Sequence, residues 1–415
     1  MNDRSDPPLS DVRVLDLTRL LPGGFCSLLL ADFGADVVKV EDTGMGDYVR
    51  WAPPYYGTED QQALGTRSAL YLALNRGKRS IRLDLKSEAG RDAFLRLARD
   101  HDVVLESFRP GVLDRLGCGY EALRDVNPRI VYCAITGYGQ TGPNTDRAGH
   151  DMNYLGLNGL LGLTGEPGGR PIQSAGQIAD LGGGALMAAF GVLAALRERE
   201  RSGEGQLVDV SMADGSLAWL AMVAAQYLCD GEVPERGRGS LNGGLACYLP
   251  YEASDGWVTC GALESKFWRN FCEGVGRPDL IDKQFVAPGS EDWREIAAIF
   301  KSRSREEWRA FNDEHDAMIE PVLDLDEALD SELVREREMV VNLEQPELGP
   351  VRLLGLPVKL SRTPGEATRP APALGEDTEA VLRDAGFGDG EIAALLDSGA
   401  AAGPNRATEQ ERFLA

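Results

Sequence analysis

The first forty residues alternate between apolar runs and polar breaks at the spacing of an α/β unit. Residues 12–17 predict a buried strand, residues 25–33 an apolar helix, and residues 36–40 a second strand. Pro22-Gly-Gly24 predicts a turn before the helix, and Gly34 is suited to the left-handed position that ends it. A strand–helix–strand unit of this length implies two parallel strands joined by a right-handed crossover.

The same alternation continues over the next 170 residues of the sequence. Further strands are predicted at 80–85, 103–105, 130–135 and 206–210, and helices at 88–99, 111–116, 120–126 and 180–200. Strands that alternate with helices favour an α/β fold, with a large doubly wound, Rossmann-like domain built on a parallel sheet.

The pattern changes after Asp214. An apolar helix at 216–228 and a glycine-rich charged stretch precede a hairpin around Asp255-Gly256, and helices follow at 266–274, 293–300 and 305–314. Strand character returns at 349–360, a proline- and glycine-rich stretch follows, and a last helix is expected at 391–396. We place a large α/β domain at 1–212 and 345–400, connectors at 213–245 and 336–344, a small α+β domain at 246–335, and a disordered tail at 401–415.

Composition narrows the classes of partner. With 43 Lys and Arg against 66 Asp and Glu, the net charge is −23, which disfavours nucleic acid and anionic membrane surfaces. We find no apolar run of about 20 residues and no secretory signal, so we expect a cytoplasmic protein. The seven cysteines form no C-x-x-C pair, which indicates neither a disulfide framework nor a metal site.

Basic residues gather at one place in this acidic chain. Arg76, Lys78, Arg79 and Arg82 lie within seven residues, and Arg109 follows the strand at 103–105. Open α/β sheets bind ligands beyond the carboxyl ends of their strands, and phosphates need such cations. Each residue alone is slightly better explained as a solvated surface cation, but the cluster favours an anion site. A dinucleotide site is disfavoured, because G-x-G-x-x-G is missing from the first turn.

Three residues are candidates for acid–base chemistry. His150 follows Ala148-Gly149 and begins an apolar segment, which places it at a helix N-terminus; a purely structural histidine fits this position as well. Asp180 precedes three glycines, and helix capping alone would explain it. The three glycines imply that a ligand or another helix approaches the backbone closely. Glu264 follows an apolar strand, and nothing local distinguishes it from a cap.

Taken together, seven ordered stretches resemble the family III CoA-transferases and α-methylacyl-CoA racemases, the CaiB/BaiF group, over roughly residues 8 to 397. They are LADFGADVVKVE at 30–41, LNRGKRS at 74–80, ESFRPG at 106–111, GYGQTGP at 137–143, AGHDMNY at 148–154, ADLGGG at 179–184 and GALESKF at 261–267. Two stretches depart from the racemases. Many racemases carry a basic residue where this chain has Asp42, and residues 44–74 are longer and more like those of the transferases.

The resemblance implies a role for each candidate residue. The transferases use the aspartate at the position of Asp180 as a nucleophile, whereas the racemases use it as an acid/base together with a G-H-D histidine and a glutamate, here His150 and Glu264. It further implies that Arg76, Lys78, Arg79 and Arg109 contact the phosphates of coenzyme A, that the backbone of 149–151, including Asp151, offers N–H groups to a developing oxyanion, and that Tyr154 lines the acyl pocket.

The resemblance also implies an interlocked homodimer, an acyl-CoA substrate, and no tightly bound cofactor or metal. We expect an acyl-CoA racemase that transfers a proton at the α-carbon of a 2-methylacyl-CoA. A CoA transferase that forms an aspartyl anhydride at Asp180 is the alternative, and an acyl-CoA-binding protein without turnover is a third possibility.

Overall fold

The computed structural model describes residues 6–57 and 65–404, which divide into two compact units. The larger unit holds Met1–Asn158, Gly176–Ala218 and Glu332–Ala415, and the smaller unit holds Gly159–Ala175 and Trp219–Ser331. Residues 159–175, which the sequence pattern assigns to the large domain, therefore belong to the smaller unit.

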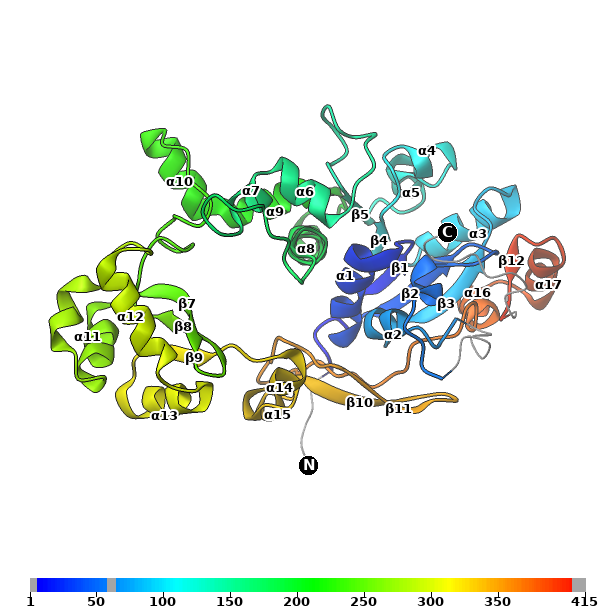
Figure 1. Cartoon of the computed structure of the whole chain (residues 1–415). Helices are drawn as coiled ribbons and strands as arrows, with labels where there is room; N and C mark the ends of the chain where they lie inside the picture. The colour runs from blue at the N-terminus through cyan, green and yellow to red at the C-terminus, as the bar shows by residue number, and fades with distance from the viewer. Residues whose placement is uncertain (1–5, 58–64, 405–415) are drawn as a thin grey trace. The chain divides into compact units, whose positions relative to one another are not determined.

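A seven-stranded sheet forms the centre of the larger unit, with the strand order β12-β3-β2-β1-β4-β5-β6 (Figure 1). All neighbouring pairs are parallel except β12, which runs antiparallel to β3. The predicted doubly wound α/β architecture is thus confirmed. The strands are β1 (Arg13–Asp16), β2 (Asp36–Glu41), β3 (Arg79–Leu83), β4 (Val103–Glu106), β5 (Val131–Thr136), β6 (Leu207–Ser211) and β12 (Ala401–Ala402).

Helices connect these strands, and most of them match the predicted positions. They are α1 (Leu20–Asp32), α2 (Ala69–Asn75), α3 (Glu88–Ala98), α4 (Val112–Arg115), α5 (Tyr120–Val126), α6 (Asp151–Leu157), α8 (Met187–Ser202), α9 (Met212–Leu217), α16 (Thr378–Asp384) and α17 (Asp389–Asp397), with 3-10 turns η1 (Tyr48–Trp51) and η4 (Ala218–Leu220). The predicted turn at Pro22-Gly-Gly24 is wrong, because α1 already begins at Leu20. Pro22 is tolerated there, since the first turn of a helix needs no backbone donor.

A π-helix, η3 (Ile178–Leu186), begins the long helix that continues as α8. Its glycines allow another helix to approach. A Cβ atom on Gly183 would lie 2.6 Å from the backbone oxygen of Met212, and one on Gly215 would lie 2.0 Å from the backbone oxygen of Gly183. Helix–helix packing between η3 and α9 therefore explains the close approach that the three consecutive glycines imply.

The segment Ile178–Ser202 is a single 25-residue helix that is long and apolar enough to cross a membrane, by length and composition alone. This differs from the expectation drawn from the sequence. Val192, Ala195 and Leu196 of this segment are buried, which is equally typical of the core helix of a globular domain.

The C-terminal segment returns to the large sheet, where β12 pairs Ala401 with Leu83 at the β3 edge. The expected disordered tail therefore contains a strand at its start, and its remainder from residue 405 lies outside the described residues. A two-stranded antiparallel hairpin, β10 (Val340–Gln345) and β11 (Gly349–Leu354), occupies part of the expected connector at 336–344 and the first half of the strand expected at 349–360.

The smaller unit has a three-stranded antiparallel sheet, β7 (Tyr248–Ala253), β8 (Gly256–Gly261) and β9 (Ile319–Pro321), so the predicted hairpin is confirmed and gains a third strand. Its core is a stack of aromatic rings, with Phe300 between Tyr251 at 4.2 Å and Phe271 at 5.0 Å, measured between ring centroids. Its helices are α7 (Leu160–Leu163), α10 (Ala221–Asp230), α11 (Ser265–Gly274), α12 (Glu291–Lys301), α13 (Arg305–His315) and α14 (Leu325–Leu329), with the 3-10 turn η5 (Pro278–Lys283); α15 (Glu332–Glu336) opens the return to the larger unit.

Candidate active site

A cavity of about 490 Å³ lies in the larger unit, where three neighbouring strands end. Arg19 and Leu20 follow β1, residues 107–110 follow β4, and Thr136 ends β5, so the lining comes from the carboxyl edge of the parallel sheet. Ligands bind at this edge in open α/β sheets. The remaining wall is formed by residues of the segment 145–154, together with Pro22, Asp180 and Met212.

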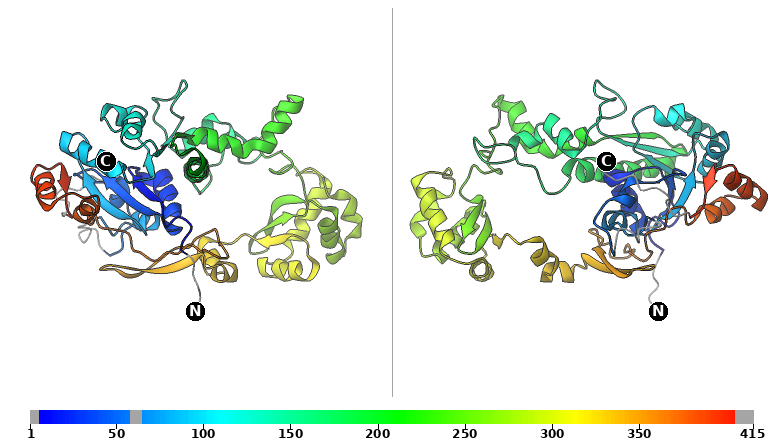
Figure 2. Two further views of the ribbon diagram at one scale, coloured as in Figure 1. Left: turned by 180° about the vertical axis from the view of Figure 1, so that it is seen from behind. Right: turned by 45° about the vertical axis from the view of Figure 1, so that its right-hand side comes forward.

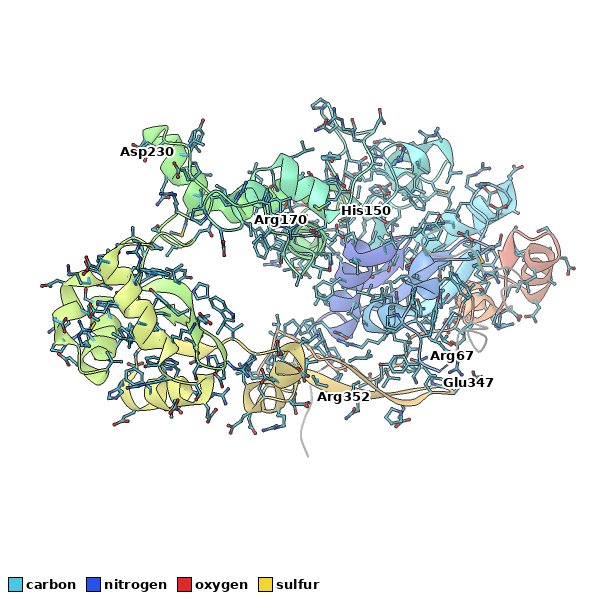
Figure 3. The ribbon with its side chains drawn as sticks, viewed as in Figure 1. Arg67, His150, Arg170, Asp230, Glu347 and Arg352 are labelled. Atoms are coloured by element: carbon cyan, nitrogen blue, oxygen red, sulfur yellow. The ribbon has the colours of Figure 1, made fainter. Side chains whose placement is uncertain are left out.

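His150 is the N-cap residue of α6, and its side chain is exposed. Figure 3 labels this residue. Its backbone N–H donates to Asn153 Oδ1 at 3.0 Å, and Asn153 in turn donates its backbone N–H to the carbonyl oxygen of His150 at 2.8 Å. These reciprocal bonds fix the backbone at the start of the helix. The imidazole makes no hydrogen bond or ion pair with the described residues, so it is available to a ligand or to another chain.

Asp180 lines the same cavity from the first turn of η3. The pKa of its carboxyl is raised to about 6, chiefly by burial; the nearby charge of Asp151 contributes to the rise, and His150 opposes it. The buried Asp151 carboxylate accepts the backbone N–H groups of Ala179 at 2.6 Å and of Asp180 at 3.1 Å. Asp151 therefore both anchors the turn that carries Asp180 and adds a negative charge beside it.

Tyr154 closes the wall between the glycine-rich loop and α6. Its hydroxyl donates to the carbonyl oxygen of Gly149 at 2.5 Å, and its ring packs edge-on against Tyr138 at 5.2 Å. A Cβ atom on Gly137 would lie 2.5 Å from this ring, and one on Gly149 would lie 2.7 Å from it. Glycine at both positions lets the loop lie flat against the ring. Tyr154 lines the cavity, and its expected contact with an acyl chain stays a prediction.

Three arginines line this cavity, although the chain as a whole is acidic. The exposed guanidinium groups of Arg109 and Arg147 make no ion pair or hydrogen bond with the part of the chain that the structure describes. Arg19 is half-buried and pairs with Asp42 at 2.8 Å. Asp180 is the carboxylate among the lining residues, so positive charge predominates and favours an anionic ligand.

The expected phosphate-binding cluster at 76–79 does not line this cavity. Arg76 is buried in a pair with Asp32 at 2.6 Å. Lys78 is fully buried against Asp16 at 3.3 Å, and this burial lowers its pKa to about 8 although the charge of Asp16 opposes the shift. Arg79 pairs with two carboxylates outside the cavity lining, Asp36 at 2.6 Å and Asp384 at 3.0 Å.

The free-energy cost of breaking an ion pair is much larger for buried cations than for exposed ones. Removing one partner of a buried ion pair leaves an uncompensated buried charge and costs about 3–5 kcal/mol. Exposed pairs contribute about 0–1 kcal/mol. Arg76 and Lys78 are therefore held in buried ion pairs and do not line the cavity, whereas Arg109 lines it. The expected contacts of these residues with a phosphate stay a prediction.

Glu264 belongs to the smaller unit, whereas His150 and Asp180 belong to the larger one. It is the exposed N-cap residue of α11, and its side chain makes no capping hydrogen bond. The cavity that contains His150 and Asp180 is lined without it. Of the three expected catalytic residues, the chain brings two into one cavity.

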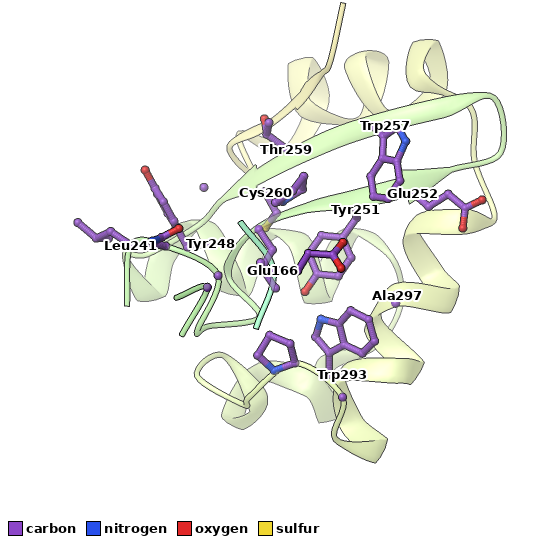
Figure 4. Close-up of a pocket in the computed structure, with 18 of the residues that line it drawn as sticks. Glu166, Leu241, Tyr248, Tyr251, Glu252, Trp257, Thr259, Cys260, Trp293 and Ala297 are labelled. Atoms are coloured by element: carbon purple, nitrogen blue, oxygen red, sulfur yellow. The ribbon is translucent and has the colours of Figure 1, made fainter. Parts of the chain in front are cut away.

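The smaller unit contains a second, open cavity of about 1600 Å³ beside the sheet β7-β8-β9. Tyr251, Trp257 and Trp293 line it together with Glu166 (Figure 4). Its lining contains no histidine, and none of the residues expected to be catalytic contributes to it. Within the described residues, no group of three or more His, Cys, Asp or Glu side chains is placed to hold a metal ion.

Sequence reasoning missed Arg19, Phe108 and Arg147 as lining residues. Arg19 lies just beyond the carboxyl end of β1, where ligands bind in open α/β sheets. Arg147 lies three residues before His150, so its nearness to the candidate histidine is the signal that could have identified it. They escaped notice because neither belongs to a local cluster of basic residues.

Comparison with known proteins decides the family. The sequence profile of CoA-transferase family III matches residues 9–378. The chain belongs to this family. The crystal structure of a CAIB/BAIF family protein from Brucella suis matches this member of family III with a TM-score of 0.78 and 30% identity, covering 92% of this chain and 100% of that one.

Relatives of both reaction types resemble this family III chain equally. It is 37% identical over 398 residues to the succinyl-CoA:mesaconate CoA-transferase of Haloarcula hispanica, which covers 92% of this chain and 97% of that protein. It is also 37% identical over 397 residues to the alpha-methylacyl-CoA racemase of Mus musculus, which covers 93% and 96%. Identity therefore supports an enzyme of coenzyme A thioesters but does not separate racemase from transferase.

Proposed function

We propose that this family III enzyme is an acyl-CoA racemase that moves a proton at the α-carbon of a 2-methylacyl-CoA. The observation that carries the proposal is the presence of an imidazole and a carboxyl of raised pKa in one cavity, His150 and Asp180. Inversion at a carbon next to a thioester requires a base on one face and an acid on the other.

The pKa of Asp180 favours acid–base chemistry. A general acid or base works best with a pKa near the working pH, and burial brings this carboxyl to about 6. A nucleophilic carboxylate needs only to be ionised, which an ordinary aspartate achieves at neutral pH. Moreover, a transferase that attacks through Asp180 leaves the imidazole of His150 without a function.

In the proposed reaction, one of the two groups removes the α-proton, the thioester oxygen accumulates negative charge, and the other group returns a proton to the opposite face. Free backbone N–H groups near the oxygen stabilise that charge. The N–H of His150 is already bonded to Asn153, so of the expected donors at 149–151 those of Gly149 and Asp151 remain.

Coenzyme A transfer is the second candidate function, and the succinyl-CoA:mesaconate relative favours it. In that reaction the carboxylate of Asp180 attacks the thioester carbonyl and expels the CoA thiolate. The aspartyl anhydride is then opened by the returning thiolate, which releases the first acid and leaves an aspartyl-CoA thioester. The incoming carboxylate attacks the carbonyl of this thioester and expels the CoA thiolate, which leaves a second aspartyl anhydride. The thiolate then attacks the acyl carbonyl of that anhydride, which releases the new acyl-CoA and the free carboxylate of Asp180.

Solvent exchange separates the two reactions. Wild-type enzyme is incubated with a 2-methylacyl-CoA in deuterated water, and the mass of the recovered thioester is measured by mass spectrometry. The racemase incorporates one deuteron at the α-carbon. A parallel sample receives hydroxylamine, which captures an aspartyl anhydride or thioester at Asp180 but not an enolate. Hydroxylamine inactivation, with no deuterium in the thioester and with CoA moved between carboxylic acids, would establish the transferase instead.

We further propose that Glu264 completes the site of a partner chain in an interlocked homodimer. Glu264 is exposed in the smaller unit, and the imidazole of His150 makes no hydrogen bond or ion pair with the described residues, which supports this arrangement. Exposed apolar side chains support it too: Phe190 of α8 is 73% exposed, Leu228 of α10 is 80% exposed, and no residue of α10 is buried. Figure 2 shows α8 and α10 from two further sides.

Complementation tests the shared site. His150→Ala and Glu264→Ala proteins are each inactive under this proposal, and refolding them together produces mixed dimers in which one site retains both residues. Recovery of activity in the mixture supports the interlocked dimer. A fully active monomer, measured by light scattering at the assay concentration, would contradict it.

A cytoplasmic location remains a prediction from composition.

A further inference from the structure

Arg19 differs from the other two arginines of the cavity because an internal carboxylate already holds its guanidinium. Nη2 of Arg19 donates to Asp42 Oδ2 at 2.8 Å, and Nη1 donates to the hydroxyl of Tyr48 at 2.9 Å. The other carboxylate oxygen of Asp42 accepts the backbone N–H groups of Gly44 and Gly46. One carboxylate oxygen of Asp42 is therefore held by the turn that follows it, and the other accepts from Arg19.

Aromatic rings orient the same guanidinium. Its central carbon lies 5.0 Å from the ring centroid of Tyr48 and 5.7 Å from that of Phe108. Phe108 itself lines the cavity and immediately precedes Arg109, and the backbone N–H of Arg19 donates to Ser107 in the same loop. The planar fork of Arg19 is thus pre-oriented on the cavity wall, in the same lining as Arg109, which has no ion-pair partner among the described residues.

The pair Arg19–Asp42 is exposed enough to be exchanged. The side chains are 29% and 42% exposed, compared with 3% for each partner of the pair Arg76–Asp32. Water screens an exposed pair and solvates the carboxylate when the pair opens. An incoming phosphate carries more charge than a carboxylate and matches the arginine fork in two parallel hydrogen bonds.

We propose that Arg19 binds a phosphate group of coenzyme A, and that Asp42 occupies this phosphate position in the free enzyme. The carboxylate keeps the arginine fork in place while the site is empty and leaves it when the phosphate arrives. Asp42 consequently competes with the ligand, and the affinity for coenzyme A is lower than the three cavity arginines alone would give. The inference rests on the proposed function only in taking coenzyme A as the ligand, which racemase and transferase share.

The competition predicts opposite effects for the two partners of one ion pair. Arg19→Gln removes the phosphate contact and weakens the binding of free coenzyme A by about tenfold or more. Asp42→Asn retains a side-chain oxygen for the turn but removes the competing charge, so it tightens binding by up to about fivefold. If Asp42 were merely structural, its substitution would weaken binding or leave it unchanged.

Isothermal titration with free coenzyme A on full-length protein measures both effects at low and high salt. Arg305→Gln and Glu327→Gln serve as matched controls, because that pair has similar exposure, 24% and 39%, and lies in the smaller unit. Neither control changes the affinity. Repeating the titration with 3′-dephospho-CoA identifies the phosphate: if the loss in Arg19→Gln disappears, the contact is to the 3′-phosphate, and if it persists, the contact is to the diphosphate.

A double variant completes the test. In the Arg19→Gln background, Asp42→Asn gains less affinity than it does in wild type, because no guanidinium remains to be released. An equal gain in both backgrounds would mean that Asp42 acts only through overall charge, and wild-type affinity in Arg19→Gln would remove Arg19 from the site. Either result would overturn the inference yet leave α-proton exchange, and with it the proposed reaction, intact.

Discussion

Two groups of cationic side chains lie in the larger unit, and their surroundings differ. Arg76 and Lys78 are buried in pairs with carboxylates, whereas Arg109 and Arg147 line a cavity and pair with no carboxylate of the described residues. The first group resembled a phosphate site in the sequence because its members are adjacent. The comparison shows that burial and pairing, rather than local density of charge, decide which cations are available to a ligand.

The largest expected effect lies on the cavity side of this comparison. His150→Ala lowers α-proton exchange by about 10²–10⁴-fold, since a general acid–base group contributes that much. Because the imidazole is exposed and without a partner among the described residues, the melting temperature stays unchanged. Met152→Ala, an exposed position on the same helix, serves as the control. An unchanged exchange rate in His150→Ala would exclude it from the chemistry.

On the buried side, Arg76→Met removes one partner of an enclosed pair. The free energy of unfolding falls by about 3–5 kcal/mol, because Asp32 remains charged or must take up a proton. Denaturant titration measures the loss, and Arg76→Met/Asp32→Asn recovers part of it. If the single variant keeps wild-type stability and binds coenzyme A weakly, Arg76 acts in the ligand site after all.

Ionisation of Asp180 destabilises the folded protein, whereas the ion pair of Arg76 supports it. Its folded pKa of about 6 lies above the ordinary 3.8, so the native state binds a proton more readily than the unfolded chain does. Stability from this group is present below pH 4 and is lost as pH rises through 6. Asp180→Asn therefore stabilises the protein by about 1–3 kcal/mol at pH 7.

The measurement is the difference in unfolding free energy between Asp180→Asn and wild type at several pH values. The difference shrinks as pH falls and approaches zero at about pH 3 and below, where the carboxyl is protonated in both the folded and the unfolded state. A stabilisation that is the same at pH 4 and pH 7 would show that ionisation of Asp180 is not its cause. The variant is also expected to lose α-proton exchange.

Arg109→Gln tests the comparison through ligand affinity. Loss of one charge-assisted contact weakens coenzyme A binding by about tenfold and reduces its dependence on salt. Arg79→Gln is the informative partner, because Arg79 is held by Asp36 and Asp384 outside the cavity lining and its loss leaves the affinity unchanged. Equal weakening in both variants would show that Arg79 and Arg109 contribute to the same binding site.

The smallest effect is expected where a pair is most exposed. Asp384 is 69% exposed and holds only one edge of Arg79. Asp384→Asn changes the free energy of unfolding by less than about 1 kcal/mol, and salt abolishes the difference. A loss comparable to that in Arg76→Met would show that exposure does not distinguish the two kinds of pair.

Local patterns were sufficient for most of the secondary structure. The parallel strands of the large sheet, the hairpin at Asp255-Gly256 and the last helix follow from periodicities and turn residues that act within a few positions, whereas β12 does not. The start of α1 was misjudged because Pro-Gly-Gly is a turn signal by local propensity, while packing of Gly24 near Leu74 and of Gly23 beside Thr18 favours continuing the helix through it. Strand β9 is three residues long and depends on pairing with β8.

The amino-acid sequence by itself determined the α/β fold and the order of its elements, because each depends on the identity of near neighbours along the chain. It also placed His150 and Asp180 among the candidates. Only the tertiary structure decided that these two side chains share a cavity, that Asp151 supports the turn carrying Asp180, and that Arg76 and Lys78 are buried in ion pairs. Those facts depend on contacts between residues that are distant in sequence and on how strongly these contacts bury charged groups away from water. No local sequence pattern encodes either.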